Sequence, residues 1–210
     1  MGRWEPNARG RLAQAALTLY AEQGFEQTTA AEIAGAAGLT ERTFFRHFAD
    51  KREVLFYGTD AVRDLMMRAV ADAPRTAGAM DTVGLVLRSV GTVIQEGGDL
   101  ARVRAAVVSA TPELRERELV KLAEFAEAMA GALRARGVAG PAASLAAETG
   151  LAVYKVAFAR WASEPGQPEF PRVLQECLAE LRDVLAGGSP PRPDPHARQE
   201  RPGSARAPRG

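Results

Sequence analysis

The chain has almost none of the residues on which disulfide frameworks and metal sites depend. Cys177 is its single cysteine, and His47 and His196 are its two histidines. One thiol forms no intramolecular disulfide, and two histidines so far apart in sequence show no zinc-ligand spacing. Cys177 lies in an apolar stripe at helical spacing, which indicates a small core residue. No glycine-rich phosphate-binding loop is present either, so we expect neither a metal nor an organic cofactor.

Long apolar runs and a large excess of one charge are also lacking. The 27 basic and 26 acidic residues leave a net charge of +1. This excludes a general polyanion binder and requires any nucleic-acid contact to come from locally placed arginines and lysines. No apolar run approaches the about 18 residues of a transmembrane helix, and the start of the chain, MGRWEPNARG, lacks the apolar core of a signal peptide. We therefore expect a protein that does not enter the membrane and acts in the cytoplasm.

Strand patterns are absent as well, and apolar residues recur at helical spacing. The predicted fold is all-α, with an N-terminal three-helix helix-turn-helix domain over residues 1–50 and a larger helical domain over residues 51–187. Residues 188–210 are rich in proline, glycine and arginine with little to bury, so we expect a disordered tail. Glycine and proline breaks divide the chain into predicted helices at 6–23, 30–37, 41–47, 51–71, 79–96, 100–110, 112–136, 141–162 and 168–185.

The segment TTAAEIAGAAGLTERTFFRHFADKR, residues 28–52, carries the start and stop signals of two short helices joined by a tight turn. Thr29 and Glu32 have the spacing of a capping box. Gly38 supplies the positive φ that ends the first helix, and Thr40 is a good cap for the second. Two helices joined in this way form the helix-turn-helix motif, whose second helix enters the DNA major groove.

Hydrogen-bonding side chains occupy the outer face of this second helix, and apolar residues occupy its inner face. Phe44 and Phe48 are predicted core residues that close against an apolar stripe on the preceding helix. The outer hydroxyl, guanidinium and imidazole groups suit phosphates and base edges. Asp50 and Glu53 repeat the capping pattern, which predicts a helix over residues 51–71 running from this unit into the second domain.

Residues 9–55 resemble the DNA-binding domain of the TetR family of bacterial transcription regulators, through GF, TT, IA, AAGLT, an aromatic pair, HF and the lysine after the loop. The resemblance implies that the second helix contacts DNA and that Phe45, His47 and Lys51 stand at positions that mostly hold backbone phosphate. Arg42 replaces a frequent glycine and adds a bidentate reader suited to guanine, while Phe45 replaces a frequent tyrosine and lacks its phenol. The predicted DNA-binding residues are Thr29, Thr40, Glu41, Arg42, Thr43, Phe45, Arg46, His47 and Lys51.

Broad apolar stripes run along the helices predicted at 141–162 and 168–185. Stripes wider than one internal contact needs favour an isologous homodimer that forms a four-helix bundle, although purely internal packing would also use them. The TetR resemblance favours the homodimer, because such proteins pair through their last two long helices. The predicted interface residues are Leu145, Ala152, Val156, Leu174, Leu178, Leu181 and Leu185.

The middle helices offer methionine and aromatic side chains that can line a cavity for a small molecule. A ligand pocket is implied by the resemblance, and the same residues would equally build a well-packed core. Tyr154 and Trp161 carry polar groups that need partners when buried, and the scarcity of charges around them indicates an apolar or amphipathic ligand. The predicted pocket residues are Met66, Val70, Leu87, Val90, Phe125, Met129, Tyr154, Phe158 and Trp161.

The favoured interpretation is a homodimeric transcription regulator, a repressor by resemblance, that binds a palindromic operator in double-stranded DNA and releases it when a small-molecule effector binds. The helix predicted at 51–71 would carry the signal between the two domains. Two alternatives remain: a DNA-binding helical dimer without a ligand, and a helical ligand-binding protein or enzyme that has kept a non-binding helix-turn-helix. No acid–base pair or activated nucleophile stands out, so the sequence predicts no enzyme.

Overall fold

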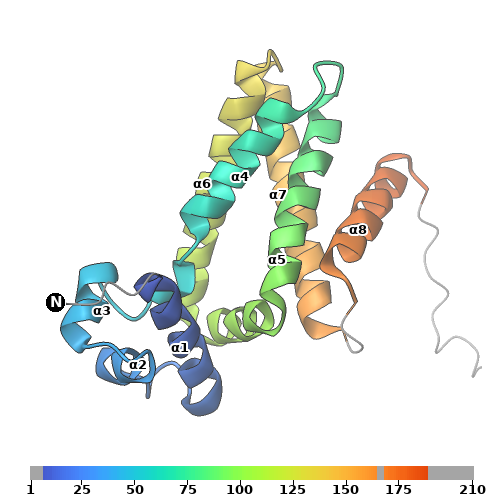
Figure 1. The fold of residues 1–210 in the computed structure, drawn as a ribbon. Coiled ribbons are helices and arrows are strands. Elements are labelled where there is room, and N and C mark those ends of the chain that lie inside the picture. The colour runs from blue at the N-terminus through green and yellow to red at the C-terminus, as the bar shows by residue number, and fades with distance from the viewer. Residues whose placement is uncertain (1–6, 165–167, 189–210) are drawn as a thin grey trace, which may run out of the picture.

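The computed structural model describes residues 7–164 and 168–188, and within these ranges the chain is helical without any β-strand. The all-α prediction is confirmed. Figure 1 shows the N-terminal helices gathered at one end of the remaining helices. Residues 189–210, nearly all of the predicted tail, lie outside the described ranges. The elements are α1 (Ala8–Gln23), α2 (Ala30–Ala36), α3 (Glu41–His47), the 3-10 helix η1 (Glu53–Phe56), α4 (Thr59–Asp72), α5 (Ala79–Ala110), α6 (Pro112–Ala135), α7 (Gly140–Ser163) and α8 (Phe170–Leu185).

Two hydrophobic cores hold these helices together. The first lies under α1, α2 and α3 and also takes in the buried residues of η1, with Val108 from the end of α5 and Leu114 from the start of α6. The second lies among α4, α5, α6, α7 and α8 and contains Trp161 and Phe170 as its largest side chains. Both α5 and α6 therefore contribute residues to both cores. None of the helices described is long and apolar enough to cross a bilayer.

The helix ends of the N-terminal unit follow the local signals in the sequence. The Thr29 amide donates to Glu32 Oε2 at 2.8 Å and the Glu32 amide donates to Thr29 Oγ1 at 3.2 Å, which completes the predicted capping box. Hydrogen bonds from Thr29 also lower the pKa of the Glu32 carboxyl. Gly38 has a φ of 66° at the turn, and Thr40 Oγ1 accepts the Thr43 amide at the start of α3. These bonds set the angle between α2 and α3.

The helix predicted over residues 51–71 is wrong, because the chain breaks it in two. Asp50 does accept the amides of Arg52 and Glu53, at 2.8 and 3.0 Å, but it caps only the single turn of η1. The three apolar residues 54–56 are all buried in the first core. Gly58 then adopts a φ of 91°, a conformation that favours glycine, and α4 starts afresh at Thr59. The two domains are thus connected by η1, a break at Gly58 and α4, and not by one continuous helix.

The predicted break at Gly97–Gly98 appears as a kink inside α5. Gly98 has φ 49° and ψ −126°, which is not helical. After the kink, α5 changes direction and crosses the foot of the long helices toward α1, drawn in light green in Figure 1. This last part of α5 brings Val108 into the first core. The kink therefore lets one helix contribute to both cores.

Candidate nucleic-acid interface and ligand cavity

The α3 helix is held by its apolar side and presents charged and aromatic groups on the other. Phe44 is fully buried in the first core, and Phe48, directly after the helix, is almost fully buried. Arg42 and Arg46 are exposed, and Phe45 is 53% exposed with its ring edge-to-face against Phe44 at a centroid distance of 5.4 Å. The helix is thus a rigidly anchored rod with two guanidinium groups and one aromatic ring on its free surface.

The threonines predicted to contact DNA already make hydrogen bonds at the helix starts. Thr29 exchanges bonds with Glu32, and its hydroxyl lies 2.8 Å from Glu32 Oε2. The Thr40 and Thr43 hydroxyls are 3.0 Å apart. Glu41 is exposed in the first turn of α3, where a carboxylate interacts favourably with the helix dipole. Thr40, Glu41 and Thr43 therefore lie at the amino end of α3, which Thr40 caps, whereas Thr29 caps α2.

His47 ends α3 and is partly enclosed. Its Nε2 atom is buried and has no hydrogen-bond partner within the described part of the chain. A buried ring nitrogen without a partner is uncommon in folded proteins. A phosphate contact from His47 would therefore use the other ring nitrogen, Nδ1, or a rotated ring.

Lys51 is used inside the fold, contrary to its predicted place on a phosphate. Its Nζ donates to three backbone carbonyls, those of Phe25, Glu26 and Thr28, at 2.8, 3.1 and 3.1 Å. An ammonium group has three donors, so all of them are satisfied. The same group lies 4.5 Å from the centre of the Phe25 ring, and the Lys51 carbonyl accepts the Tyr20 hydroxyl at 2.7 Å. Lys51 therefore braces the loop between α1 and α2.

Replacing Lys51 with methionine should destabilise the protein by about 2 kcal/mol, because a charged donor is lost and three carbonyls lose their partner. Methionine keeps the apolar stem over Phe25. Urea unfolding at fixed protein concentration measures the effect. Arg46→Met, on the exposed face of α3, is the control and should leave stability unchanged. Unchanged stability of the Lys51 variant, with a weaker salt dependence of DNA binding, would instead restore the phosphate role.

A cavity of about 530 Å³ lies among α4, α5, α6 and α7, within the size range of small-molecule sites. Its wall is largely apolar, and Tyr154 and Phe158 stack within it at a centroid distance of 5.6 Å. Burial and the nearby charge of Glu118 raise the pKa of Tyr154, so its phenol stays neutral. The predicted pocket residues that line the cavity are Met66, Leu87, Val90, Phe125, Met129, Tyr154 and Phe158.

Val70 and Trp161 were also predicted to line the pocket, but they lie in the packed core outside its wall. Val70 is almost fully buried and Trp161 is fully buried. The Trp161 indole N–H donates to the Pro168 carbonyl at 2.9 Å. The Arg102 guanidinium covers the indole face at 4.0 Å and donates to the Trp161 carbonyl at 2.6 Å. The indole N–H of Trp161 thus has its partner inside the protein and is not available to a ligand.

The cavity also has a charged end that the sequence interpretation missed. Arg104, at the end of α5, and Glu118, in the first half of α6, lie in its wall together with Arg68 and Lys121. In the sequence these residues resemble solvated positions on helix surfaces. The kink at Gly98 is what turns Arg104 toward α6, and no local pattern reports that turn.

The N-terminal sequence matches a known family. Residues 12–57 match the sequence model described as bacterial regulatory proteins, tetR family. This N-terminal unit is a TetR-family domain. The chain is 34% identical over 117 residues to the HTH-type transcriptional regulator TcmR of Streptomyces glaucescens, a match that covers 56% of this chain and 51% of that protein. The chain thus spans about half the length of this curated relative.

Solved structures show the TetR fold over most of the chain. FadR of Thermus thermophilus, in complex with lauroyl-CoA, superposes with a TM-score of 0.52 at 25% identity, covering 93% of this chain and 100% of that one. FadR of Bacillus subtilis, in complex with stearoyl-CoA, superposes with a TM-score of 0.62 at 19% identity, covering 86% and 98%. The helices beyond the TetR-family domain therefore have the arrangement found in these regulators.

The apolar residues predicted for a TetR-type dimer interface separate into two groups. Leu145 and Val156 on α7 are 69% and 58% exposed, Leu185 at the end of α8 is 77% exposed, and Ala152 is exposed between them in sequence. Leu181 is half-buried against the second core. By contrast, Leu174 and Leu178 belong to the core of the same chain.

Leu174 and Leu178 are therefore removed from the predicted interface. Leu174 packs against Gly91 so closely that a Cβ on this glycine would lie 2.7 Å from Leu174 Cδ1. Leu178 similarly faces Gly84 of α5. The small residues of α5 let α8 approach closely, and this approach buries Leu174 and Leu178 within the same chain. The outer apolar residues of α7 and the end of α8 are left without intramolecular cover.

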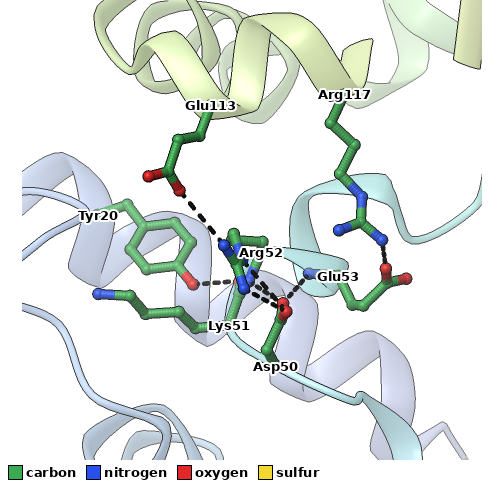
Figure 2. A network of polar contacts seen from close by, with 7 residues as sticks. All are labelled: Tyr20, Asp50, Lys51, Arg52, Glu53, Glu113 and Arg117. Atoms are coloured by element: carbon green, nitrogen blue, oxygen red, sulfur yellow. Dashed lines mark hydrogen bonds and ion pairs between the residues drawn. The ribbon is translucent and has the colours of Figure 1, made fainter. Parts of the chain in front are cut away.

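Charged residues tie the TetR-family domain to the long helices, as Figure 2 shows. Arg52 binds Asp50 at 3.0 Å and reaches Glu113 of α6 at 3.3 Å. Glu53 of η1 forms an ion pair with Arg117 of α6. These bonds lie beside the part of the first core that η1 shares with the start of α6. The position of the DNA-binding unit therefore depends on how α6 and the end of α5 sit against η1.

Proposed function

We propose that the protein is a sequence-specific transcription regulator that binds double-stranded DNA through α3 as a homodimer. The observation that carries the proposal is the exposed face of α3, with Arg42, Phe45 and Arg46 projecting from a helix anchored by buried Phe44. The TetR-family match over residues 12–57 supports it. A helix so presented suits insertion into the major groove.

The exposed residues of α3 divide the work of recognition. Arg42, in the first turn, reads a base edge, because a guanidinium binds guanine O6 and N7 in bidentate fashion. Arg46 lies one turn further along the helix and binds backbone phosphate. Thr43, Thr40 and His47 add phosphate or sugar contacts at the two helix ends. The Phe45 ring has no hydroxyl, so it packs against a sugar or a thymine methyl group.

Two copies pair through the exposed apolar residues of α7 and the end of α8. A single short helix reads only a few base pairs, whereas two helices related by a two-fold axis read a palindrome with half-sites about 34 Å apart. The operator is therefore a palindrome. A regulator of this kind acts in the cytoplasm, where bacterial DNA lies.

A small-molecule effector occupies the cavity and releases the operator, so the protein acts as a repressor. The cavity volume and its largely apolar wall support this role. So do the similar structures, since the two FadR proteins are complexes with lauroyl-CoA and stearoyl-CoA, and the Thermus thermophilus protein is described as a transcriptional repressor. Effector binding then needs to favour a half-site spacing that does not match the operator.

Arg42→Ala should weaken operator binding by about 1–3 kcal/mol and relax the preference at one base pair in each half-site. Arg46→Ala is the matched comparison on the same face. It should weaken all duplexes by a similar factor and lower the salt dependence of binding by about one phosphate contact per half-site. Fluorescence anisotropy on the operator and on single-base variants measures both. Equal losses on every sequence for the two variants would contradict this division of roles.

The test of the function itself is a selection from random double-stranded oligonucleotides with purified protein, at two salt concentrations. We expect a palindrome with half-sites one helical turn apart, bound more tightly at low salt. Enrichment of no sequence at either salt concentration would refute the proposed function. Enrichment of a single half-site would refute the two-fold assembly.

A further inference from the structure

The charged end of the cavity is unlike the rest of its wall. Most lining residues are apolar, but Arg104 and Glu118 face each other across the gap between α5 and α6, with Arg68 and Lys121 also in the wall. Three of these four groups are cationic and one is anionic. An apolar chamber with a charged end on one side suits a molecule with an apolar body and one charged group.

Arg104 makes contacts on both sides of this wall. Its Nη1 and Nη2 donate to the two Glu118 carboxylate oxygens at 3.2 and 2.5 Å. Its Nε donates to the Leu55 carbonyl at 2.6 Å, and the guanidinium lies 5.3 Å from the centre of the Phe56 ring. Leu55 and Phe56 belong to η1 and are buried in the first core. One side chain therefore touches both the ligand cavity and the DNA-binding unit.

The balance of charge decides which sign of ligand this end accepts. Glu118 is already held by Arg104, in a bidentate pair of the strong kind that planar guanidinium and carboxylate groups form. Arg68 adds a further positive charge in the wall, and Lys121 is also there, with its Nζ paired to Glu124 Oε2 at 3.0 Å. A cationic ligand would meet the guanidinium groups of Arg68 and Arg104, while the Glu118 carboxylate in the wall is already paired. An anionic group would meet the same two guanidinium groups and could displace the Glu118 carboxylate from Arg104.

We propose that the cavity takes an amphipathic molecule whose apolar body lies along α4 and α7 and whose acidic group binds Arg104 in competition with Glu118. The proposal deepens the proposed function by naming the class of effector, and it rests on that function only for its consequence on DNA. A carboxylate, sulfonate or acidic phenol would serve as the anionic group. The neutral Tyr154 phenol, near Glu118, can donate a hydrogen bond to it.

Competition at Arg104 also gives the ligand a route to the DNA-binding unit. A guanidinium drawn toward an anion inside the cavity gives up part of its contact with Glu118 and with the Leu55 carbonyl. The η1 turn then loses a hydrogen bond that ties it to α5. A ligand can shift a conformational equilibrium only by making different contacts in the two states, and the Arg104 bond to Leu55 is such a difference.

Two fluorescent probes with the same ring system test the ligand class. 8-Anilino-1-naphthalenesulfonate carries a sulfonate, and N-phenyl-1-naphthylamine is its uncharged parent. We expect the wild-type protein to bind the sulfonate the more tightly, at one site per chain. Arg104→Gln should weaken sulfonate binding about tenfold and change binding of the parent by less than about twofold. Glu118→Gln should tighten sulfonate binding by about threefold to tenfold, because the competing charge is gone.

Arg115→Gln and Glu116→Gln on the exposed side of α6 are the matched controls and should change neither affinity. Equal affinity of the wild-type protein for both probes would overturn the proposal. So would weaker sulfonate binding by Glu118→Gln, which would show that the carboxylate helps to hold the ligand. Because Glu118→Gln is expected to gain affinity, general loss of folding cannot imitate the predicted result.

Hydrogen exchange tests the route to η1 without DNA. We expect the amides of residues 53–58 to exchange faster in the protein saturated with the sulfonate probe than in the protein saturated with its parent. Identical exchange with both probes would overturn the route. None of these measurements uses an operator, so a failed oligonucleotide selection would refute the proposed function and leave the ligand class standing. Failure of the probe experiments would do the reverse.

Discussion

Trp161→Ala is expected to destabilise the protein by about 3–5 kcal/mol, the range for truncating a large buried aromatic side chain. Trp161 is fully buried, and its ring lies 5.2 Å from Phe170 and 5.6 Å from Phe158, centre to centre. Alanine would leave a cavity between α7 and α8 and would remove the aromatic face beneath Arg102. The Pro168 carbonyl would lose its indole donor.

Urea unfolding followed by circular dichroism at a fixed protein concentration measures this loss, since the stability of an oligomer depends on concentration. Trp161→Phe keeps an aromatic ring but lacks the N–H group, so it should lie between wild type and alanine. Lys155→Ala, exposed on the same helix, should change stability by less than about 0.5 kcal/mol. A Trp161→Ala protein as stable as the Lys155 variant would show that this core tolerates the cavity.

The N-terminal unit was the most predictable part of the molecule, because its signals are local. A capping box needs two residues three apart, and a C-terminal glycine needs only its own φ. The predicted helix over residues 41–47 coincides with α3, and the one at 30–37 ends one residue later than α2. The exposed face of α3 followed from the same short segment, once Phe44 and Phe48 were placed inside.

The segment that joins the domains was predicted wrongly because long-range packing overrides a local cap there. Asp50 and Glu53 have the pattern of a helix start, and the apolar residues that follow suit a helix as well. Three consecutive residues at 54–56 are nevertheless needed in the first core, where they meet Val108 and Leu114. A single 3-10 turn buries all three, and Gly58 then adopts its positive φ at low cost before α4 begins. Residues about 50 positions away in sequence decide this conformation.

The same limit explains why Lys51 was predicted to bind phosphate and why Arg104 was not singled out. A lysine beside a DNA-binding helix and an arginine on a helix surface both suggest contacts with solvent or phosphate. Lys51 instead reaches three carbonyls in the loop after α1, and Arg104 reaches Leu55 and Glu118. The partners of both side chains lie in other parts of the chain than the side chains themselves. The spacing of residues within one stretch of sequence cannot predict such long-range contacts.

The positions of the apolar stripes on α7 and α8 were predicted from the sequence. Which of their residues pack inside the same chain was not. Periodicity identifies the apolar residues of a helix, but it does not say how many other helices share them. Gly84 and Gly91 let α8 come so close to α5 that Leu174 and Leu178 become internal. Leu145 and Val156 on α7 have no such neighbour and remain exposed. They form the surface on which the proposed homodimer depends.

Val156→Asp is expected to produce a monomer at micromolar concentration and to weaken operator binding by about 100-fold or more. In a two-fold assembly each copy places the new carboxylate into the shared apolar surface, where an unpaired charge costs several kcal/mol. A monomer then binds each half-site alone and loses the high effective concentration that dimerisation gives the second α3 helix. Light scattering after size-exclusion chromatography reports the mass, and anisotropy reports the operator affinity.

The chain offers a closely matched control in Val120→Asp. Val120 is also 58% exposed, but it lies on α6, outside the proposed interface. The same change of side chain at the same exposure should leave both mass and operator affinity unaltered. If both variants stay dimeric, the exposed stripe of α7 is not the pairing surface. If both become monomeric, the pairing surface extends over α6, and the geometry that sets the spacing of the two α3 helices would differ from the one proposed.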